Sequence, residues 1–209
     1  MRMLSRFLLL LIVCNVYSQK QDFIPVPVKP IRSYQIKINN INGTNFYLYN
    51  DIEHIPLTGK YEISLFFLDK SKKDSLINDN GKMRKTLQYD TKYSNYSRLN
   101  VYLIGEFVKG YKNGLWKTLY KNKLVKTINY RNGLVIGRYR VYNTKGAILY
   151  KTTFGSKGNG TFKDYYYKTG VLKQEGNYKN GKKEGEWCDY NELGEITKIT
   201  VYNKGMPQE

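Results

Sequence analysis

Residues 178–199 read YKNGKKEGEWCDYNELGEITKI, and this stretch decides the expected fold. It contains an Asn-Gly pair at 180–181, a glycine two residues before Trp187, and a further glycine two residues before Ile196. Asn and Gly accept the positive φ of tight turns that other residues resist. Two strands of about 6 residues with two turns of about 4 to 5 residues make one β-hairpin of ~22 to 24 residues. The stretch therefore predicts one antiparallel hairpin.

The same pattern recurs through the C-terminal half of the chain with spacings of 23 to 24 residues. One series of aromatic residues occupies Phe107, Tyr130, Phe154, Tyr178 and Tyr202. A second series, each member two residues after a glycine, occupies Trp116, Tyr139, Phe162 and Trp187. The pairs Asn113-Gly114, Asn132-Gly133 and Asn180-Gly181 are expected turns, and so are the segments around Gly146, Gly170 and Gly194.

A single hairpin cannot bury its aromatic face, so successive hairpins must pair edge to edge. We therefore predict an all-β fold in which tandem hairpins form an elongated, twisted antiparallel sheet. No proline occurs between Leu57 and Met206, as an uninterrupted sheet requires. We expect the core to be built from eight anchor residues, which are Phe107, Trp116, Tyr130, Tyr139, Phe154, Phe162, Tyr178 and Trp187.

The unit Tyr178-x-Asn180-Gly181-x-x-x-Gly185-x-Trp187-x-x-Tyr190-x-x-x-Gly194-x-Ile196 resembles the bacterial variant of the MORN repeat, found in exported and antitoxin-type repeat proteins. The resemblance covers about four copies and part of a fifth, from Gly105 to Gly205. It implies an extended twisted sheet of consecutive hairpins over residues 101–209. In the third copy Gly155-Ser156-Lys157-Gly158 replaces the Asn-Gly turn, and in the first Asn122 replaces the second turn glycine. We expect these departures to loosen local turns only.

The N-terminus is typical of a secretory signal peptide. Arg2 and Arg6 precede a short apolar run, and residues 16–18 suit cleavage before Gln19. We predict a signal peptide at 1–18 and an exported protein, periplasmic or secreted. The alternative is a lipoprotein anchored through Cys14, although the preceding Val13 is larger than the residue usual there.

Two regions separate the signal peptide from the repeats. Residues 19–30 contain three of the five prolines and form an expected extended leader. Residues 31–100 are interpreted as an N-terminal β extension that caps the array, or as degenerate repeats around Gly43, Gly59 and Gly81.

Charge is distributed unevenly along the chain. The formal net charge is +18, and it falls to +16 when the signal peptide is removed. Residues 107–163 contain thirteen basic and no acidic residues, whereas 164–209 contain seven basic and eight acidic ones. Such a surface attracts anionic headgroups, lipopolysaccharide phosphates or acidic proteins. A lysine-rich composition and protection of sheet edges are the alternative explanation. The candidate residues for an anionic partner are Lys109, Lys112, Lys117, Lys121, Lys123, Arg131, Arg138, Arg140 and Lys163.

The composition argues against most catalytic centres. One His and two Cys cannot supply a Cys/His zinc site or an iron–sulfur cluster. Glu184 and Glu186 could share a strand face, but nothing indicates the burial that acid–base catalysis needs. His54 is expected in a surface loop, and Cys188 is expected to face away from Trp187. We expect no enzyme activity, no cofactor, no metal and no small-molecule substrate.

We therefore expect a non-catalytic repeat protein that acts as a binding or scaffolding surface at the cell envelope, toward a protein or an anionic surface. The alternative is an antitoxin or immunity-type protein that neutralises a toxin, and a third possibility is an accessory part of a larger envelope assembly. Nucleic acid is a weak candidate, because the aromatic residues follow the hairpin period and serve the core. The oligomeric state is open.

Overall fold

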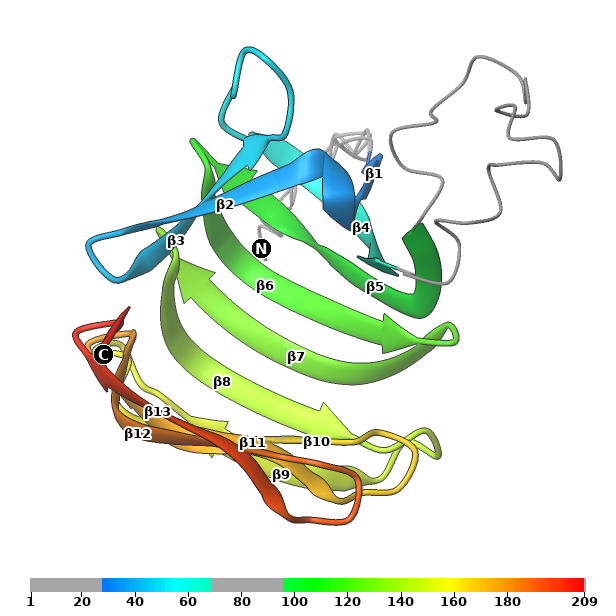
Figure 1. Ribbon diagram of the computed structural model, residues 1–209, viewed down its shortest axis with the longest axis vertical. Coiled ribbons are helices and arrows are strands. Elements are labelled where there is room, and N and C mark those ends of the chain that lie inside the picture. The colour runs from blue at the N-terminus through cyan, green and yellow to red at the C-terminus, as the bar shows by residue number, and fades with distance from the viewer. Residues whose placement is uncertain (1–27, 69–95, 209) are drawn as a thin grey trace, which may run out of the picture.

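The structure is a computed structural model that describes residues 28–68 and 96–208, and within these the fold is all-β (Figure 1). A 3₁₀ turn, η1 (Ser33–Gln35), interrupts the strands. The N-terminal strands are β1 (Lys29–Arg32), β2 (Ile36–Ile41), β3 (Thr44–Tyr49) and β4 (Gly59–Leu68). The central strands are β5 (Tyr96–Val108), β6 (Tyr111–Tyr120), β7 (Lys123–Arg131), β8 (Leu134–Tyr142) and β9 (Ile148–Thr153). The last five are β10 (Gly160–Tyr165), β11 (Leu172–Lys179), β12 (Lys182–Tyr190), β13 (Ile196–Asn203) and β14 (Met206–Pro207).

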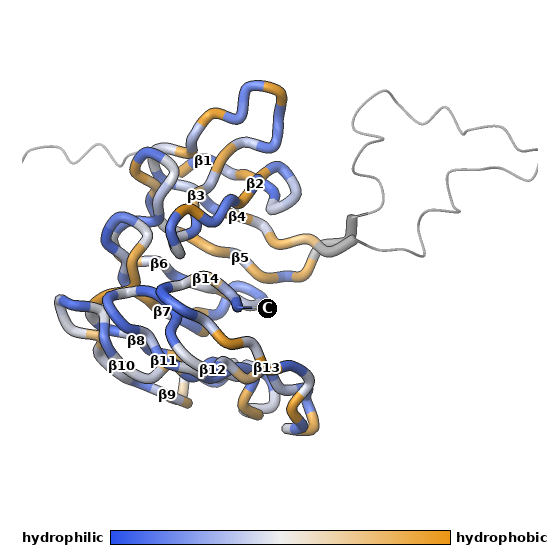
Figure 2. Tube along the Cα trace, turned by 60° about the vertical axis from the view of Figure 1, so that its left-hand side comes forward, coloured by the Kyte–Doolittle hydropathy of each residue, from blue (hydrophilic) through white to orange (hydrophobic). Residues whose placement is uncertain are grey.

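Consecutive strands pair as antiparallel hairpins, as the repeat period predicts. A seven-stranded sheet has the order β1-β4-β5-β6-β7-β8-β9, and a five-stranded sheet runs from β10 to β14. The hairpin β2-β3 forms a small sheet of its own, and β1 joins β4 in parallel. The two large sheets are curved and open, and they follow one another in Figure 1. Figure 2 shows polar and apolar segments interleaved along their strands.

The array is divided into two sheets at the irregular third copy. The expected effect of Gly155-Ser156-Lys157-Gly158 was a looser turn within one continuous sheet, but no ladder joins β9 to β10. The longer link displaces β10, and the neighbouring turns hold the junction instead. The Gly181 amide donates to the Gly158 carbonyl at 2.9 Å, and the Val135 amide donates to the Gly181 carbonyl at 3.0 Å. The prediction of a single sheet was therefore wrong at this link.

In three of the four copies, the glycine two residues before the anchor marks a β-bulge rather than a turn. Asn132-Gly133 and Asn180-Gly181 do form turns, but Asn113-Gly114 lies inside β6, and the turn preceding it is Lys109-Gly110. Gly114 has φ +66°, and the β5–β6 register shifts beside it. Glycine supports the positive φ of such a bulge at little cost. The sequence pattern located this residue correctly and assigned it the wrong local structure.

The core lies on one face of the two sheets, which we call the inner face and define by the anchors Trp116, Tyr139, Phe162 and Trp187. Their exposed fractions are between 0% and 6%. The rings of Tyr139 and Phe162 stack across the break between the sheets with centroids 4.9 Å apart. Side chains alternate between the two faces of a strand, so the residue after each anchor points to the opposite face, which we call the outer face. Phe107 and Phe154 are also buried, whereas Tyr130 and Tyr178 are half-buried.

The N-terminal region adds strands to the array and closes one end of it. Tyr61 of β4 pairs with Gly105 of β5, so β4 extends the first sheet. Lys29 and Pro30, assigned to the leader from the sequence, belong to β1. The tip of the β2-β3 hairpin reaches the last turn of the chain, where the Asn40 amide donates to the Gly205 carbonyl at 3.3 Å (Figure 1). The predicted signal peptide, the rest of the expected leader and Gly81 lie outside the described residues.

Candidate functional site

The outer face of the first sheet carries an aligned row of basic residues. Strand register places Lys117 opposite Thr127, Thr127 opposite Arg140, and Arg140 opposite Lys151. Adjacent strands lie about 4.8 Å apart, so the row spans roughly 15 Å. Arg138 lies two residues from Arg140 on the same face. We call Lys117, Arg138, Arg140 and Lys151 the outer basic row.

The outer basic row has an acidic residue near one end, because Glu106 lines the same surface pocket as Lys117, but no ion pair joins them. The four residues of the row make no ion pair within residues 28–68 and 96–208, whereas Lys163 on the second sheet binds Glu175 at 3.1 Å. That ion pair raises the pKa of Lys163, chiefly through the hydrogen bond to Glu175. The outer basic row on strands β6, β8 and β9 therefore keeps its positive charges unpaired in the described part of the chain.

The remaining basic candidates from the sequence are dispersed. Lys109, Lys121 and Lys123 are exposed at or beside turns. Arg131 is also exposed and donates to the Ser156 carbonyl at 2.7 Å, across the irregular link. Lys112 lies on the inner face instead, with its ammonium 4.4 Å from the Trp116 ring centroid. The nine residues therefore do not form one surface, and Lys151, which was not among them, completes the outer basic row.

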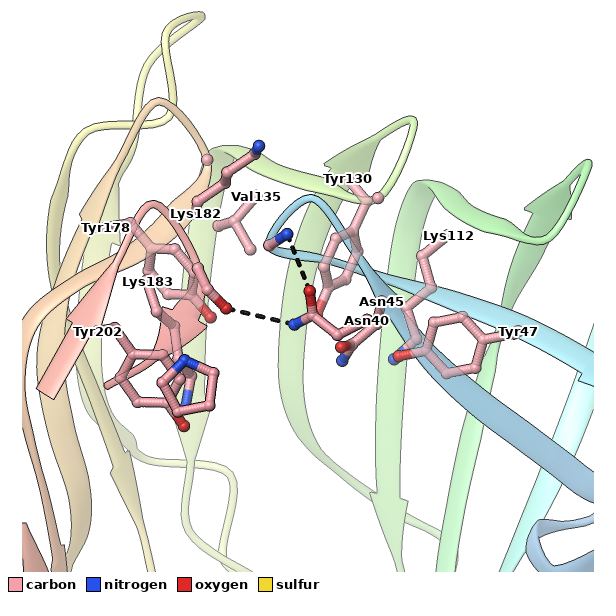
Figure 3. Close-up of a pocket in the computed structure, with 15 residues that line it drawn as sticks. Asn40, Asn45, Tyr47, Lys112, Tyr130, Val135, Tyr178, Lys182, Lys183 and Tyr202 are labelled. Atoms are coloured by element: carbon pink, nitrogen blue, oxygen red, sulfur yellow. Dashed lines mark hydrogen bonds between the residues drawn. The ribbon is translucent and has the colours of Figure 1, made fainter. Parts of the chain in front are cut away.

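A cavity of about 340 Å³ lies on the inner face, beneath the β2-β3 hairpin and beside the turns that contain Gly133, Gly181 and Gly205. Figure 3 shows Tyr47, Tyr130 and Lys112 on one side of it and Tyr178, Tyr202 and Lys183 on the other. Asn40 and Asn45 of the hairpin contribute amide groups.

The two inner-face lysines of this cavity lie over aromatic rings. The Lys112 ammonium is 5.3 Å from the Tyr47 and Tyr130 ring centroids, in addition to its contact with Trp116. The Lys183 ammonium is 3.8 Å from the Trp187 centroid and 4.8 Å from that of Tyr202. Such cation–π contacts fix the position of an ammonium group without neutralising it.

The electrostatic environments of these lysines differ. Burial lowers the pKa of Lys183, and Asp189 only partly opposes this. Burial would also lower the pKa of Lys112, but interactions with the phenol oxygens of Tyr47 and Tyr130 outweigh it and the pKa is raised. Burial raises the pKa of Tyr130 to about 12, so this phenol is neutral near pH 7 and can donate a hydrogen bond.

A separate ion pair connects the two sheets within the core. The Lys126 ammonium of β7 binds the Asp164 carboxylate of β10 at 2.6 Å, and their side chains are 20% and 11% exposed. Burial opposes the charge on Lys126, but Asp164 outweighs this and the pKa of Lys126 is raised. The two charges neutralise each other, and the pair stabilises the junction between the sheets.

The weak catalytic candidates are dispersed. Glu184 accepts a hydrogen bond from the Lys204 amide at 2.8 Å, so it stabilises a turn. Asp189 accepts from the Gln174 amide at 2.7 Å, and His54 is in an exposed turn with φ +51°. Cys188 is a free thiol beside Trp187. Within residues 28–68 and 96–208 no three His, Cys, Asp or Glu side chains gather as a metal site would require.

Sequence reasoning missed the cavity because one of its walls comes from the N-terminal β2-β3 hairpin, far from the repeats in sequence. Tyr47 and the asparagines belong to the N-terminal hairpin, whose position depends on long-range contacts. Lys183 had a detectable signal, since Lys183-Glu-Gly-Glu-Trp187 repeats Lys112-Asn-Gly-Leu-Trp116.

No family model, curated protein or solved structure matches this chain. In the described part of the chain, no helix has the length and apolar character to cross a membrane.

Proposed function

We propose that this protein is a non-catalytic MORN-like repeat protein whose outer basic row binds an anionic surface of the cell envelope. The observation that supports it is the shared register of Lys117, Arg140 and Lys151 on strands β6, β8 and β9 of one sheet, where none of them forms an ion pair with a described residue. Three aligned cations on a rigid sheet match closely spaced anionic headgroups or lipopolysaccharide phosphates. Each contributes about 1 kcal/mol at an anionic membrane surface.

The test is sedimentation with vesicles that contain phosphatidylglycerol, with phosphatidylcholine vesicles as the neutral comparison. The triple variant Lys117→Ser/Arg140→Ser/Lys151→Ser should lose about 3 kcal/mol of binding, roughly a hundredfold in affinity. The control Lys168→Ser/Lys179→Ser/Lys198→Ser removes the same charge from exposed positions outside the row and should bind nearly as the parent does.

Equal losses in both triple variants would show a response to net charge alone and would contradict a defined surface. Absence of binding to both anionic vesicles and lipopolysaccharide at low salt would refute the proposal. Capture of an acidic protein in a 1:1 complex would then favour the antitoxin or immunity-type alternative.

Export is part of the same proposal and rests on the charged and apolar pattern of residues 1–18. Mass spectrometry of the mature protein should find Gln19 at the N-terminus. A lipid-modified Cys14 would establish the lipoprotein alternative, and an intact Met1 in exported material would contradict both.

A further inference from the structure

We propose that the inner-face cavity lined by Lys112 and Lys183 binds a small organic anion of monosaccharide size, whose carboxylate or phosphate group is attracted by these ammonium groups. This site goes beyond the proposed surface binding, because it lies on the opposite face of the sheets and uses different residues. It would make the protein a receptor for a soluble ligand as well.

The repeat itself explains why a cavity forms at this place. The position four residues before the anchor is Lys112 in the first copy, Val135 in the second, Gly158 in the third and Lys183 in the fourth. Long cationic side chains thus stand at the two ends of the array, and small residues occupy the middle. Val135 lines the cavity, and its short side chain leaves the space between the lysines open (Figure 3).

The charge of the lining is one-sided. Lys112, Lys182 and Lys183 contribute ammonium groups, and no Asp or Glu is among the lining residues. The Lys182 ammonium already donates to the Asn42 carbonyl at 2.5 Å, which leaves Lys112 and Lys183 as the ligand-binding pair. Clustered cations in a partly buried space favour an anion, because the low local dielectric strengthens their attraction for it.

Hydrogen-bond donors are available around the same space. The hydroxyls of Tyr130, Tyr178 and Tyr202 have no hydrogen-bond partner among the described residues. Elsewhere in the core such hydroxyls are paired, as when Tyr139 donates to the Lys163 carbonyl at 3.0 Å and Tyr150 donates to the Thr161 carbonyl at 3.0 Å. Half-buried polar groups without protein partners are places where a ligand can bond.

The dimensions and shape limit the ligand. A volume near 340 Å³ is at the small end of the ~300 to 1,000 Å³ typical of ligand sites. The tyrosine rings present apolar surface to a ring-shaped body, and Asn45 presents an amide to its hydroxyl groups. An acidic or phosphorylated monosaccharide has these properties together.

The test uses intrinsic fluorescence, because the only two tryptophans, Trp116 and Trp187, each lie beneath one of the cavity lysines. The protein is titrated with glucuronate, glucose 6-phosphate and inorganic phosphate, with glucose as the neutral comparison. We expect a saturable change with at least one organic anion and none with glucose. No saturable change with any of the three anions at millimolar concentration would overturn the proposal.

Variants then locate the binding, measured by isothermal titration calorimetry so that altered tryptophan emission does not interfere. Lys112→Met and Lys183→Met keep the length of the side chain and should each lower affinity at least tenfold. Lys117→Met, on the outer face of the same strand as Lys112, should leave affinity unchanged. Tyr178→Phe removes one unpaired hydroxyl and should lower affinity severalfold without unfolding the core. Unchanged affinity in both cavity-lysine variants would overturn the proposal.

The two proposals can fail separately. The Lys117→Ser/Arg140→Ser/Lys151→Ser protein should retain the soluble ligand, and Lys183→Met should retain vesicle binding. Loss of both activities in Lys183→Met, with a normal thermal unfolding curve, would contradict two independent sites.

Discussion

The first and fourth repeat copies differ from the two copies between them, although all four have the same strand order. In the first and fourth copies the anchor is tryptophan, at Trp116 and Trp187, and a glycine lies against each indole. A Cβ added to Gly105 would lie 2.2 Å from the Trp116 ring, and one added to Gly176 would lie 2.3 Å from the Trp187 ring. Each indole nitrogen donates to a backbone carbonyl at 3.2 Å.

The second copy fills the same space differently. Its anchor is the smaller Tyr139, and Ile128 is paired with it at the place that glycine occupies beside the tryptophans. Large and small residues are thus exchanged across the strand pair while the core remains filled. The difference teaches that core volume is conserved between copies, whereas the position four residues before the anchor is free to vary and can take a functional role.

The largest expected effect tests whether tryptophan and tyrosine anchors contribute equally to the stability of the core. Trp187→Ala and Tyr139→Ala should each destabilise the protein by about 3 to 5 kcal/mol, since both side chains are buried. Urea unfolding measures the free energy of unfolding. Leu115→Ala, at an outer-face side chain 48% exposed, is the control and should cost well under about 1 kcal/mol. A near-neutral Trp187→Ala would show that the indole is a surface group and that the two faces are wrongly assigned.

The ion pair between the middle copies should have the next largest effect, because it crosses the break between the sheets. Asp164→Leu leaves Lys126 without its counter-charge and should cost about 2 to 3 kcal/mol, less than a fully buried pair because both side chains retain some exposure. The double variant Lys126→Met/Asp164→Leu should recover most of this loss. An equal loss in the double variant would contradict the charge explanation.

The pH dependence of this pair has a definite sign. Since the pKa of Lys126 is raised above its ordinary value, the stabilisation is fully present below pH 10.5 and is lost only as the pH rises through the raised folded value. The difference between parent and Asp164→Leu should therefore stay constant from pH 7 to pH 9.

The fold was predictable because its signals are local and repeated. Each turn glycine, bulge glycine and anchor recurs in register, so Trp116 and Trp187 could be assigned to one face from spacing alone. Gly105, Ile128 and Gly176 occupy the same repeat position, eleven residues before their anchors, but their contact with the anchor ring was not detectable, because it depends on where the bulge shifts the register.

The candidate site was only partly predictable. Lys117 and Arg140 follow their anchors by one residue, and alternation places them on the outer face. Lys151 lies in β9 after a longer turn, where spacing no longer fixes register. The cavity depends on the β2-β3 hairpin, and its contact between Gly43 and Gly205 joins residues 162 positions apart, which no local pattern encodes.

Gly176→Ala examines the Trp–Gly pairing alone. The backbone at Gly176 does not have the positive φ that favours glycine, so strain arises only from contact of the new methyl group with the Trp187 ring. Overpacking of this kind should cost about 1 to 3 kcal/mol. Trp187→Tyr imitates the anchor of the second copy. The double variant Gly176→Ala/Trp187→Tyr should lose less stability than the sum of the two single-variant losses, by roughly 0.5 kcal/mol or more. If the losses in free energy of unfolding were strictly additive, the side chains at positions 176 and 187 would not compensate for each other's volume, and this explanation would be refuted.

The smallest expected effect concerns the outer face, where the residue after the anchor is Lys117, Arg140, Lys163 and Cys188 in successive copies. Of these four residues, only Lys163 forms an ion pair within the described part of the chain, and its partner is Glu175. The pKa of Glu175 is lowered, first by the hydrogen bond from the Tyr190 hydroxyl and then by Lys163. A lowered pKa gives stabilisation that is present above pH 4.5 and is lost as the pH falls through the folded value.

Glu175→Gln should therefore cost no more than about 1 kcal/mol at pH 7, and the difference from the parent should disappear on acidification below pH 4.5. The same change frees Lys163 and extends the uncompensated charge by one strand onto the second sheet. Binding to phosphatidylglycerol vesicles should then increase by up to about fivefold, the value of one additional cation near an anionic surface. The double variant Lys163→Gln/Glu175→Gln removes the whole ion pair without changing the net charge and should leave vesicle binding at the parental level. A decrease with Lys163→Gln/Glu175→Gln equal to that of Lys117→Gln would show that Lys163 already belongs to the binding surface, and the boundary between the two sheets would then not limit that surface.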